Sequence, residues 1–207
     1  MEQGYSVYIV DDDEAVRDSL QVLLDAVGYE TESFSCGPDF LDACDAGFKG
    51  CVLLDVRMPK MSGLEVQERL QAIRPDLPVI IITGHGDIAM AVGAMKAGAL
   101  DFVEKPFHEE TLLESIDAAL KQAAQSDRQH AMSADAQRSV ERLTPRERDV
   151  LEQLVIGRPN KVIAFELGCS PRTVEIHRAR IMEKTGARSL SHLVRLSLAA
   201  GIDPDSA

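Results

Sequence analysis

Five polar side chains in the first half of this chain directly follow short apolar segments. They are Asp11, Asp12, Asp55, Thr83 and Lys105. Carboxylates that converge repel one another unless a cation lies among them, and ligands that are all oxygen favour Mg²⁺, with Mn²⁺ as the alternative. A carboxylate nucleophile, a divalent cation, a hydroxyl and a lysine are the groups needed to receive a phosphoryl group and hold it. We therefore expect this chemistry if the five groups meet.

Each of these residue types also has an ordinary structural role. An aspartate at the end of a strand often caps the next helix, and Asp13 fits that role. A lysine before a proline, such as Lys105, is usually a solvated surface residue. The functional interpretation therefore depends on the whole group lying at one edge of a sheet.

The segments that would position these groups alternate between strand and helix five times. The strand candidates are residues 6–10, 30–34, 51–54, 78–82 and 100–103, and the helix candidates are 16–27, 38–46, 64–73, 88–97 and 109–122. Apolar rather than alternating strands indicate a parallel sheet that is covered on both faces. We expect an α/β doubly wound, five-stranded parallel sheet, in which ligands bind beyond the carboxyl ends of the strands.

The second half is expected to be all helical. Residues 123–142 lose the apolar pattern but contain neither Pro nor Gly, so a linker there can be helical. Capping signals at Thr144-Pro145 and Ser170-Pro171 then begin helices. The expected division is a first domain at 1–124, a linker at 125–142 and an all-α four-helix domain at 143–207.

Charge is distributed unevenly between the two halves. The chain has 207 residues, a net charge of −12 and a pI near 4.8. Residues 1–124 hold 9 Lys and Arg against 23 Asp and Glu, a net charge of −14, whereas residues 125–207 have a net charge of +2. The window 158–188 reaches +4. This asymmetry indicates two domains with different partners.

Helix 171–184 is the basic member of a helix–turn–helix pair, and we expect it to face double-stranded DNA. Val174, Ile181 and His177 fall on the face turned to its own domain. The expected DNA contacts are Lys161, Arg172, Thr173, Glu175, Ile176, Arg178 and Arg180. Lys161 and Arg178 are expected to contact phosphates. Glu175 could accept a hydrogen bond from a cytosine amino group or form a surface salt bridge with Arg172 or Arg178.

Several features favour a cytoplasmic protein with no membrane partner. The four cysteines make no C-x-x-C pair, so free thiols in a reducing compartment are expected rather than disulfides or a zinc site. No apolar run approaches the roughly 20 residues that cross a bilayer. The N-terminal sequence MEQGYSVYIVDDD lacks the basic region of a signal peptide.

Residues 5–122 resemble the receiver domain of bacterial two-component response regulators. The matching segments are VYIVDDDE at 7–14, VLLDVRMPKMSGLE at 52–65, VIIITGHGD at 79–87 and AGALDFVEKPF at 97–107. The resemblance implies a flavodoxin-like fold, a Mg²⁺ ion and a sensor histidine kinase that donates the phosphoryl group. The implied site roles are Asp55 as phosphoacceptor, Asp11, Asp12, Asp55 and the Arg57 backbone carbonyl as metal ligands, Thr83 and Lys105 as phosphoryl partners, and Phe102 as the aromatic switch residue. It also implies a cis Lys105–Pro106 bond.

The implied mechanism follows from charge. Phosphorylation adds about one to two negative charges and three acceptor oxygens to Asp55. Thr83 then moves in to donate a hydrogen bond, and Phe102 enters the space behind it. We expect this to shift residues 87–122, the fourth helix, fifth strand and fifth helix, and to favour a homodimer. No turnover of an external substrate is implied, because a receiver assists only its own phosphotransfer and dephosphorylation.

Residues 143–200 resemble the LuxR-type DNA-binding domain. The matching segments are LTPRERDVLEQL from 143, NKVIAFELGCSPRTVEIHRARIMEKTGARS from 160 and LVRL from 193. Joined to a receiver, this resembles FixJ-like regulators, which implies transcription control. Family members commonly dimerise through the fourth helix of this domain. The candidates here are Leu190, Leu193, Val194 and Ser197, with a core position as the alternative for Leu193 and Val194.

Two other functions fit parts of the sequence. A haloacid-dehalogenase-like phosphatase also uses an Asp nucleophile with Mg²⁺, but its D-x-D-x-T/V motif breaks at Ala15. Alternatively, the C-terminal helices could bind a protein or an RNA rather than DNA. Aromatic residues are 4% of the chain and Trp is absent, which gives little support to base stacking on RNA.

Overall fold

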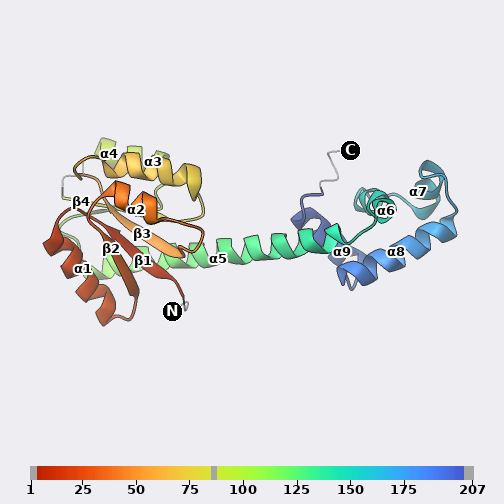
Figure 1. Ribbon diagram of the computed structural model, residues 1–207, viewed down its shortest axis with the longest axis horizontal. Helices are drawn as coiled ribbons and strands as arrows, with labels where there is room; N and C mark the ends of the chain where they lie inside the picture. The colour runs from red at the N-terminus through yellow and green to blue at the C-terminus, as the bar shows by residue number, and fades with distance from the viewer. Residues whose placement is uncertain (1–3, 85–87, 203–207) are drawn as a thin grey trace. The chain divides into compact units, whose positions relative to one another are not determined.

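The computed structural model describes residues 4–84 and 88–202 (Figure 1). The chain divides into two compact units, with the division between Asp127 and Arg128. Each unit has its own hydrophobic core, as described below.

A five-stranded, all-parallel sheet forms the centre of the first unit, in the order β2-β1-β3-β4-β5. The strands are β1 (Ser6–Val10), β2 (Glu30–Phe34), β3 (Gly50–Asp55), β4 (Val79–Thr83) and β5 (Asp101–Glu104). The chain builds outward in one direction from β1 to β2 and in the other from β3 to β5. The topological switch point therefore lies between β1 and β3, as expected for a doubly wound α/β fold.

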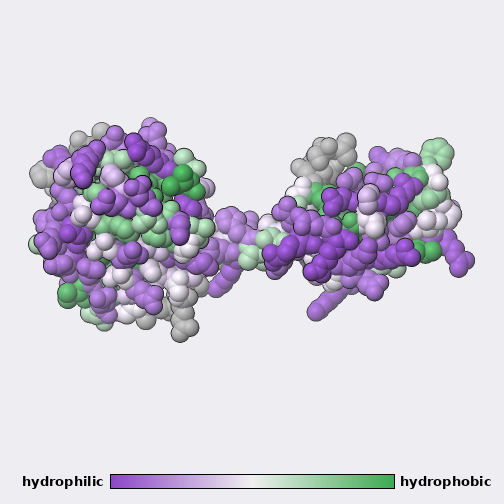
Figure 2. Space-filling view, viewed as in Figure 1, coloured by the Kyte–Doolittle hydropathy of each residue, from purple (hydrophilic) through white to green (hydrophobic). Residues whose placement is uncertain are grey.

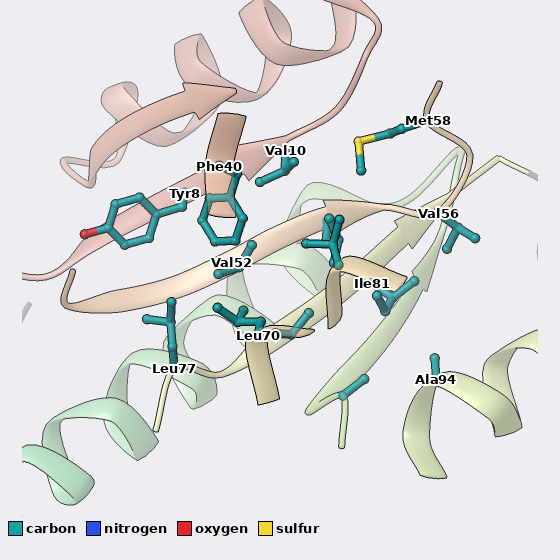
Figure 3. Packing of buried hydrophobic residues seen from close by; sticks show 14 residues of the cluster. Tyr8, Val10, Phe40, Val52, Val56, Met58, Leu70, Leu77, Ile81 and Ala94 are labelled. Carbon is teal, nitrogen blue, oxygen red and sulfur yellow. The ribbon is translucent and has the colours of Figure 1, made fainter. Parts of the chain in front are cut away.

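Helices cover both faces of this sheet because its three central strands, β1, β3 and β4, are apolar on both sides. The helices of the first unit are α1 (Glu14–Ala26), α2 (Gly37–Ala43), α3 (Gly63–Ile73), α4 (Ile88–Lys96) and the first part of α5 (Glu109–Glu141). Phe40, Leu70 and Ala94 from α2, α3 and α4 pack on one face (Figure 3). Leu24 of α1 and Ile116 of α5 pack on the other.

Capping side chains set where several helices begin. Asp13 accepts a hydrogen bond from Ala15 N at 2.9 Å, which confirms its expected role as the N-cap of α1. Ser62 and Glu65 form a reciprocal capping box at the start of α3. These caps fix the loops that follow β1 and β3, and therefore the side chains at those strand ends.

Helix α5 is longer than the sequence pattern indicates. The amphipathic pattern predicts a helix over 109–122, whereas α5 continues without interruption to Glu141. Most of the segment at 125–142 is therefore helical, and the division between the compact units falls within it. The absence of Pro and Gly from this segment is the physical reason, because no residue there interrupts the backbone hydrogen bonds.

Four helices complete the part of the chain described up to residue 202. They are α6 (Pro145–Val155), α7 (Asn160–Glu166), α8 (Pro171–Thr185) and α9 (Leu190–Ala199). Val150, Ile163, Val174 and Ile181 form the centre of their shared core. Gly186 ends α8 in the left-handed conformation at φ 67°, which favours glycine.

Two further features concern the cysteines and the helix lengths. All four cysteines are free thiols, with Cys36 and Cys51 buried. Within 4–84 and 88–202, no helix combines the length and the hydropathy needed to span a bilayer.

Candidate functional site

The carboxyl ends of β1, β3 and β4 are adjacent because β3 pairs with both of its neighbours. Asp55 is the last residue of β3, and Asp11 follows the paired end of β1. Thr83 ends β4 level with Glu104 of β5, which directly precedes Lys105. The sheet therefore brings the predicted acidic, hydroxyl and ammonium side chains to one edge.

Lys105 joins two buried carboxylates at this edge. Its Nζ lies 2.6 Å from Oδ2 of Asp11 and 2.9 Å from Oδ1 of Asp55. Asp11 and Asp55 are only 4% and 7% exposed, so a shared ammonium group replaces part of the lost solvation. Burial lowers the pKa of Lys105, but its hydrogen bonds to Asp11 and Asp55 outweigh this and raise the pKa above its ordinary value. Lys105 is therefore a positive charge at neutral pH.

The second oxygen of each carboxylate accepts a backbone N–H. Asp13 N donates to Oδ1 of Asp11 at 2.9 Å, and Arg57 N donates to Oδ2 of Asp55 at 2.6 Å. Each carboxylate is thus held between the loop that follows its strand and the Lys105 side chain. This fixes the orientation of Asp55, with both of its oxygens hydrogen bonded.

The structure assembles two of the three expected carboxylates around a cation. Asp12 is exposed at the surface. Within the described parts of the chain, no three His, Cys, Asp or Glu side chains are grouped closely enough to hold a metal ion. The expected meeting of three carboxylates is therefore not observed among these residues: Lys105 joins Asp11 to Asp55, and Asp12 is exposed instead. The donors available remain carboxylate and backbone oxygens, the ligands that Mg²⁺ prefers.

Thr83 and Phe102 lie on the two strands beyond β3. Thr83 is 1% exposed, and its carbonyl oxygen accepts a hydrogen bond from Lys105 N at 2.8 Å. Phe102 is half-buried and packs against the core cluster that includes Ala94 of α4. The Lys105–Pro106 peptide bond is cis, which confirms that expectation.

Helix α8 presents a polar outer surface. Arg172, Glu175, Ile176 and Arg180 are exposed, and Lys161 of α7 is also exposed, whereas Val174 and Ile181 are buried as expected. Thr173 is half-buried, and its backbone N–H donates to the Ser170 side chain. Figure 2 shows mostly hydrophilic residues over α8 on the side of this unit that faces the viewer.

Arg178 differs from the exposed Arg172 and Arg180 because it is half-buried and contacts the other helix of the pair. Its Nη1 donates to Oδ1 of Asn160, the first residue of α7, at 2.7 Å. Arg178 therefore joins the two helices of the helix–turn–helix pair.

Among the candidate dimer contacts on α9, Ser197 needs a correction, and Leu193 takes the core position that was its alternative. Leu193 is 1% exposed and belongs to the core of its own unit. Ser197 is also buried, and its hydroxyl donates to the Leu193 carbonyl oxygen. Both face inward because they lie one turn apart on the apolar face of α9. Leu190 is exposed and Val194 is half-buried.

Sequence reasoning missed two residues that position these surfaces. Arg17 Nη1 donates to the backbone oxygen of Asp11 at 2.7 Å, and an arginine one turn into the following helix is the signal for it. Lys184 Nζ lies 2.6 Å from Oε2 of buried Glu147, which fixes the C-terminal end of α8 to the start of α6. No local pattern indicates this second contact.

Two family models match the chain. Residues 7–117 match the response regulator receiver domain, and residues 141–197 match the luxR family of bacterial regulatory proteins. Neither match supports the phosphatase alternative.

Relatives share both regions. The transcriptional regulatory protein FixJ of Bradyrhizobium diazoefficiens is 46% identical over 196 residues, which cover 95% of this chain and 96% of that protein. The response regulator protein TodT of Pseudomonas putida is 45% identical, with coverage of 92% and 84%. The solved structure of the response regulator StyR has a TM-score of 0.82 and 44% identity, and the match covers 93% of this chain and 98% of that one.

Proposed function

The chain belongs to the FixJ-like response regulators, which join a receiver domain to a LuxR-type DNA-binding domain and regulate transcription, and from this premise we propose that phosphorylation of Asp55 controls its binding to DNA. The observation that carries the proposal is the contact of buried Asp55 with Lys105, at the sheet edge shared with Asp11 and Thr83. We assign residues 1–124 to the receiver and residues 143–207 to DNA binding.

Asp55 is the nucleophile in the proposed phosphotransfer. One of its oxygens attacks the phosphorus of a phosphohistidine on a sensor histidine kinase, so an O–P bond forms as the N–P bond breaks. Lys105 pairs with the added negative charge, for which its ammonium group is already in hydrogen-bonding distance of Asp55. Release of the phosphoryl group to water would return Asp55, and no external substrate is turned over.

Asp11, Asp12 and Asp55, together with the backbone carbonyl of Arg57, would hold Mg²⁺ at this edge. When bound, the ion supplies positive charge that offsets the repulsion between the carboxylates and the incoming phosphoryl group. Mn²⁺ has the same preference for oxygen ligands and is the expected substitute.

The signal is proposed to leave the site through Thr83 and Phe102. The Thr83 hydroxyl moves to donate to the phosphoryl group, and Phe102 turns into the space behind it. This shifts α4, β5 and the first part of α5, and favours a homodimer. The packing of Phe102 in the same cluster as Ala94 supports a direct coupling to α4.

Double-stranded DNA is the proposed partner of α8. Arg172, Thr173, Glu175, Ile176 and Arg180 would approach the bases and phosphates of the major groove, and Lys161 would contact a phosphate. Arg178 is proposed to act on DNA binding chiefly by joining α8 to Asn160. A chromosomal target and a kinase donor together place the proposed activity in the cytoplasm.

Labelling by an acyl phosphate in Mg²⁺, read by mass spectrometry of the intact chain, tests the site. We expect one added phosphoryl group in the parent and none in Asp55→Asn. Asp13→Asn is the matched control, because an asparagine can still cap α1 and Asp13 lies outside the Lys105 contacts. Undiminished labelling of Asp55→Asn would contradict the proposal.

A further inference from the structure

Gln67 is a buried polar residue outside the site described above. It lies on the inner face of α3 beside Val66 and Leu70, and it is 0% exposed. Leu70 of α3 and Ala94 of α4 belong to one core cluster, and both are labelled in Figure 3. Gln67 therefore occupies a position on the core side of α3, close to α4, where an apolar side chain would be expected.

One end of the Gln67 amide is paired across the contact between the two helices. Its Nε2 donates to the backbone carbonyl oxygen of Ala94 at 3.0 Å. The same oxygen accepts a hydrogen bond from Ala99 N, also at 3.0 Å. Loss of the Gln67 side chain would therefore leave the Ala94 carbonyl with a partner.

The other end of the amide is unpaired. Gln67 Oε1 is buried and has no hydrogen-bond partner among the residues that the structure describes. A buried acceptor without a partner costs more free energy than a neutral hydrogen bond returns, so an apolar residue of the same shape would hold α3 and α4 together more firmly.

Helical neighbours of Gln67 line an open groove between α3 and α4. A groove of about 440 Å³ separates the outer faces of α3 and α4, and its lining includes Leu64, Glu68, Gln71 and Gly93. Leu64 and Gln71 flank Gln67 at three and four residues along the helix. A small displacement of α4 from α3 would admit water to Oε1 and remove the cost of leaving it unpaired.

The two helices have different attachments to the phosphoacceptor edge. Gly63, the first residue of α3, packs so closely on the Asp55 backbone that a Cβ there would lie 2.1 Å from its carbonyl oxygen. Gly63 N also donates to the Val56 carbonyl at 2.9 Å. Helix α3 is thus fixed to the end of β3, and α4 is the element that the proposed function allows to shift.

We propose that Gln67 weakens the contact between α3 and α4 and so makes α4 easier to displace when Asp55 is phosphorylated. Gln67 is a positioning residue for this response, since it lies away from the site contacts of Asp55. The inference rests on the proposed function, in which α4 moves. This role of Gln67 differs from a purely structural one, because a residue that only supports the fold would stabilise the packing of α3 against α4, whereas Gln67 weakens it.

The test compares Gln67→Met with Gln71→Met in the full chain. Methionine keeps the length of glutamine and removes its polar atoms, and Gln71 lies one turn further along α3 at the open groove. Duplex affinity is measured in Mg²⁺ with and without beryllofluoride, a phosphoryl mimic, and thermal unfolding is recorded for each protein. Gln67→Leu is the second variant if the methionine variant does not fold.

We expect Gln67→Met to unfold at a higher temperature than the parent and to need about fivefold more beryllofluoride for half of the mimic-induced gain in duplex affinity, the order of one net hydrogen bond. Duplex affinity without the mimic should fall by up to the same factor, because the variant populates the displaced arrangement of α4 less. Gln71→Met should match the parent. An unchanged or lower requirement for beryllofluoride in Gln67→Met, or equal effects of the two variants, would overturn the inference. If the parent itself ignores beryllofluoride, the proposed function fails and the inference fails with it.

Discussion

The ammonium nitrogen of Lys105 lies 2.9 Å from Oδ1 of Asp55, although the two residues are 50 positions apart in the chain. The contact exists because β5 ends two strands away from β3, on the same edge of the sheet. Asp11 shares the same nitrogen at 2.6 Å. Two buried negative charges therefore depend on a single positive side chain, which makes Lys105 the residue whose loss should be most informative.

Lys105→Met should destabilise the first unit, because Asp11 and Asp55 would face each other without the ammonium group. We expect the free energy of unfolding at pH 7 to fall by about 1–3 kcal/mol, below the range for a fully buried pair because Lys105 is partly exposed. Added Mg²⁺ should restore more stability to this variant than to the parent, as a ligand that binds only the folded state does. Urea unfolding with and without Mg²⁺ measures both effects.

Lys49→Met is the matched control. Lys49 pairs with Asp127 at 3.4 Å, but its side chain is 55% exposed, so its loss should change stability by less than about 0.5 kcal/mol. Equal stability of Lys105→Met and the parent would show that the carboxylates do not need this cation.

The second unit should lose stability in acid through Glu147. Burial raises the pKa of Glu147, but hydrogen bonds from Lys184 and Thr144 outweigh this and lower the pKa to about 2, from about 4.5 in the unfolded chain. Because the folded pKa is the lower one, the stabilisation is complete above about pH 5 and is lost as the pH falls towards 2. We expect a contribution on the order of 2 kcal/mol at pH 7.

Denaturant unfolding from pH 7 to pH 3 measures this contribution. Glu147→Gln should reduce the stability at pH 7 and flatten its pH dependence, whereas Glu183→Gln, a change at an exposed position, should leave both close to the parent. The same acid slope in Glu147→Gln and the parent would assign the pH dependence to other groups.

Arg172→Ala and Arg180→Ala should weaken duplex binding in a salt-dependent way. Each exposed arginine that contacts a phosphate contributes about 0.9 to the slope of log affinity against log salt concentration. Fluorescence anisotropy over a range of salt concentrations gives that slope. Arg69→Ala removes the same charge from α3 of the other unit and serves as the control. An unchanged slope in both α8 variants would argue against contact of these arginines with DNA.

Arg178 and Asn160 should act as a pair. If Arg178 supports DNA binding by joining α8 to α7, Asn160→Ala should weaken duplex binding about as much as Arg178→Ala, and the double variant should cost little more than either alone. Equilibrium binding of duplex DNA by the two single variants, the double variant and the parent gives the double-mutant cycle. Additive losses would instead indicate that Arg178 contacts DNA by itself.

Strand and helix types follow closely from apolar pattern and capping residues. The segments 6–10 and 30–34 match β1 and β2, and Asp13 and Ser62 show why α1 and α3 begin where they do. Helix α5 extends beyond the amphipathic pattern at 109–122, since neither Pro nor Gly interrupts its backbone hydrogen bonds before Glu141. Its far end again buries apolar residues, and Val140 packs in the core of the second unit.

Apolar segments that end in polar residues indicated which side chains could meet at the sheet edge, but not the contacts that they make. Repeated strand–helix alternation indicates a parallel sheet, and Asp55 lies near Asp11 because β1 is adjacent to β3 in the structure. No local sequence pattern indicates that Lys105 is the cation between Asp11 and Asp55. Nor does a local pattern indicate that Asp12 is exposed. Gln67 carried no signal either, because its partner is the backbone carbonyl of Ala94 on another helix.

The most direct test of control by Asp55 is the affinity of the full chain for duplex DNA selected from a random-sequence pool. It is measured in Mg²⁺ with and without beryllofluoride, for the parent and for Asp55→Asn. We expect the mimic to tighten binding by the parent about tenfold or more and to leave Asp55→Asn unchanged. Equal affinity of the parent in both conditions, or an equal gain in Asp55→Asn, would contradict phosphorylation of Asp55 as the switch.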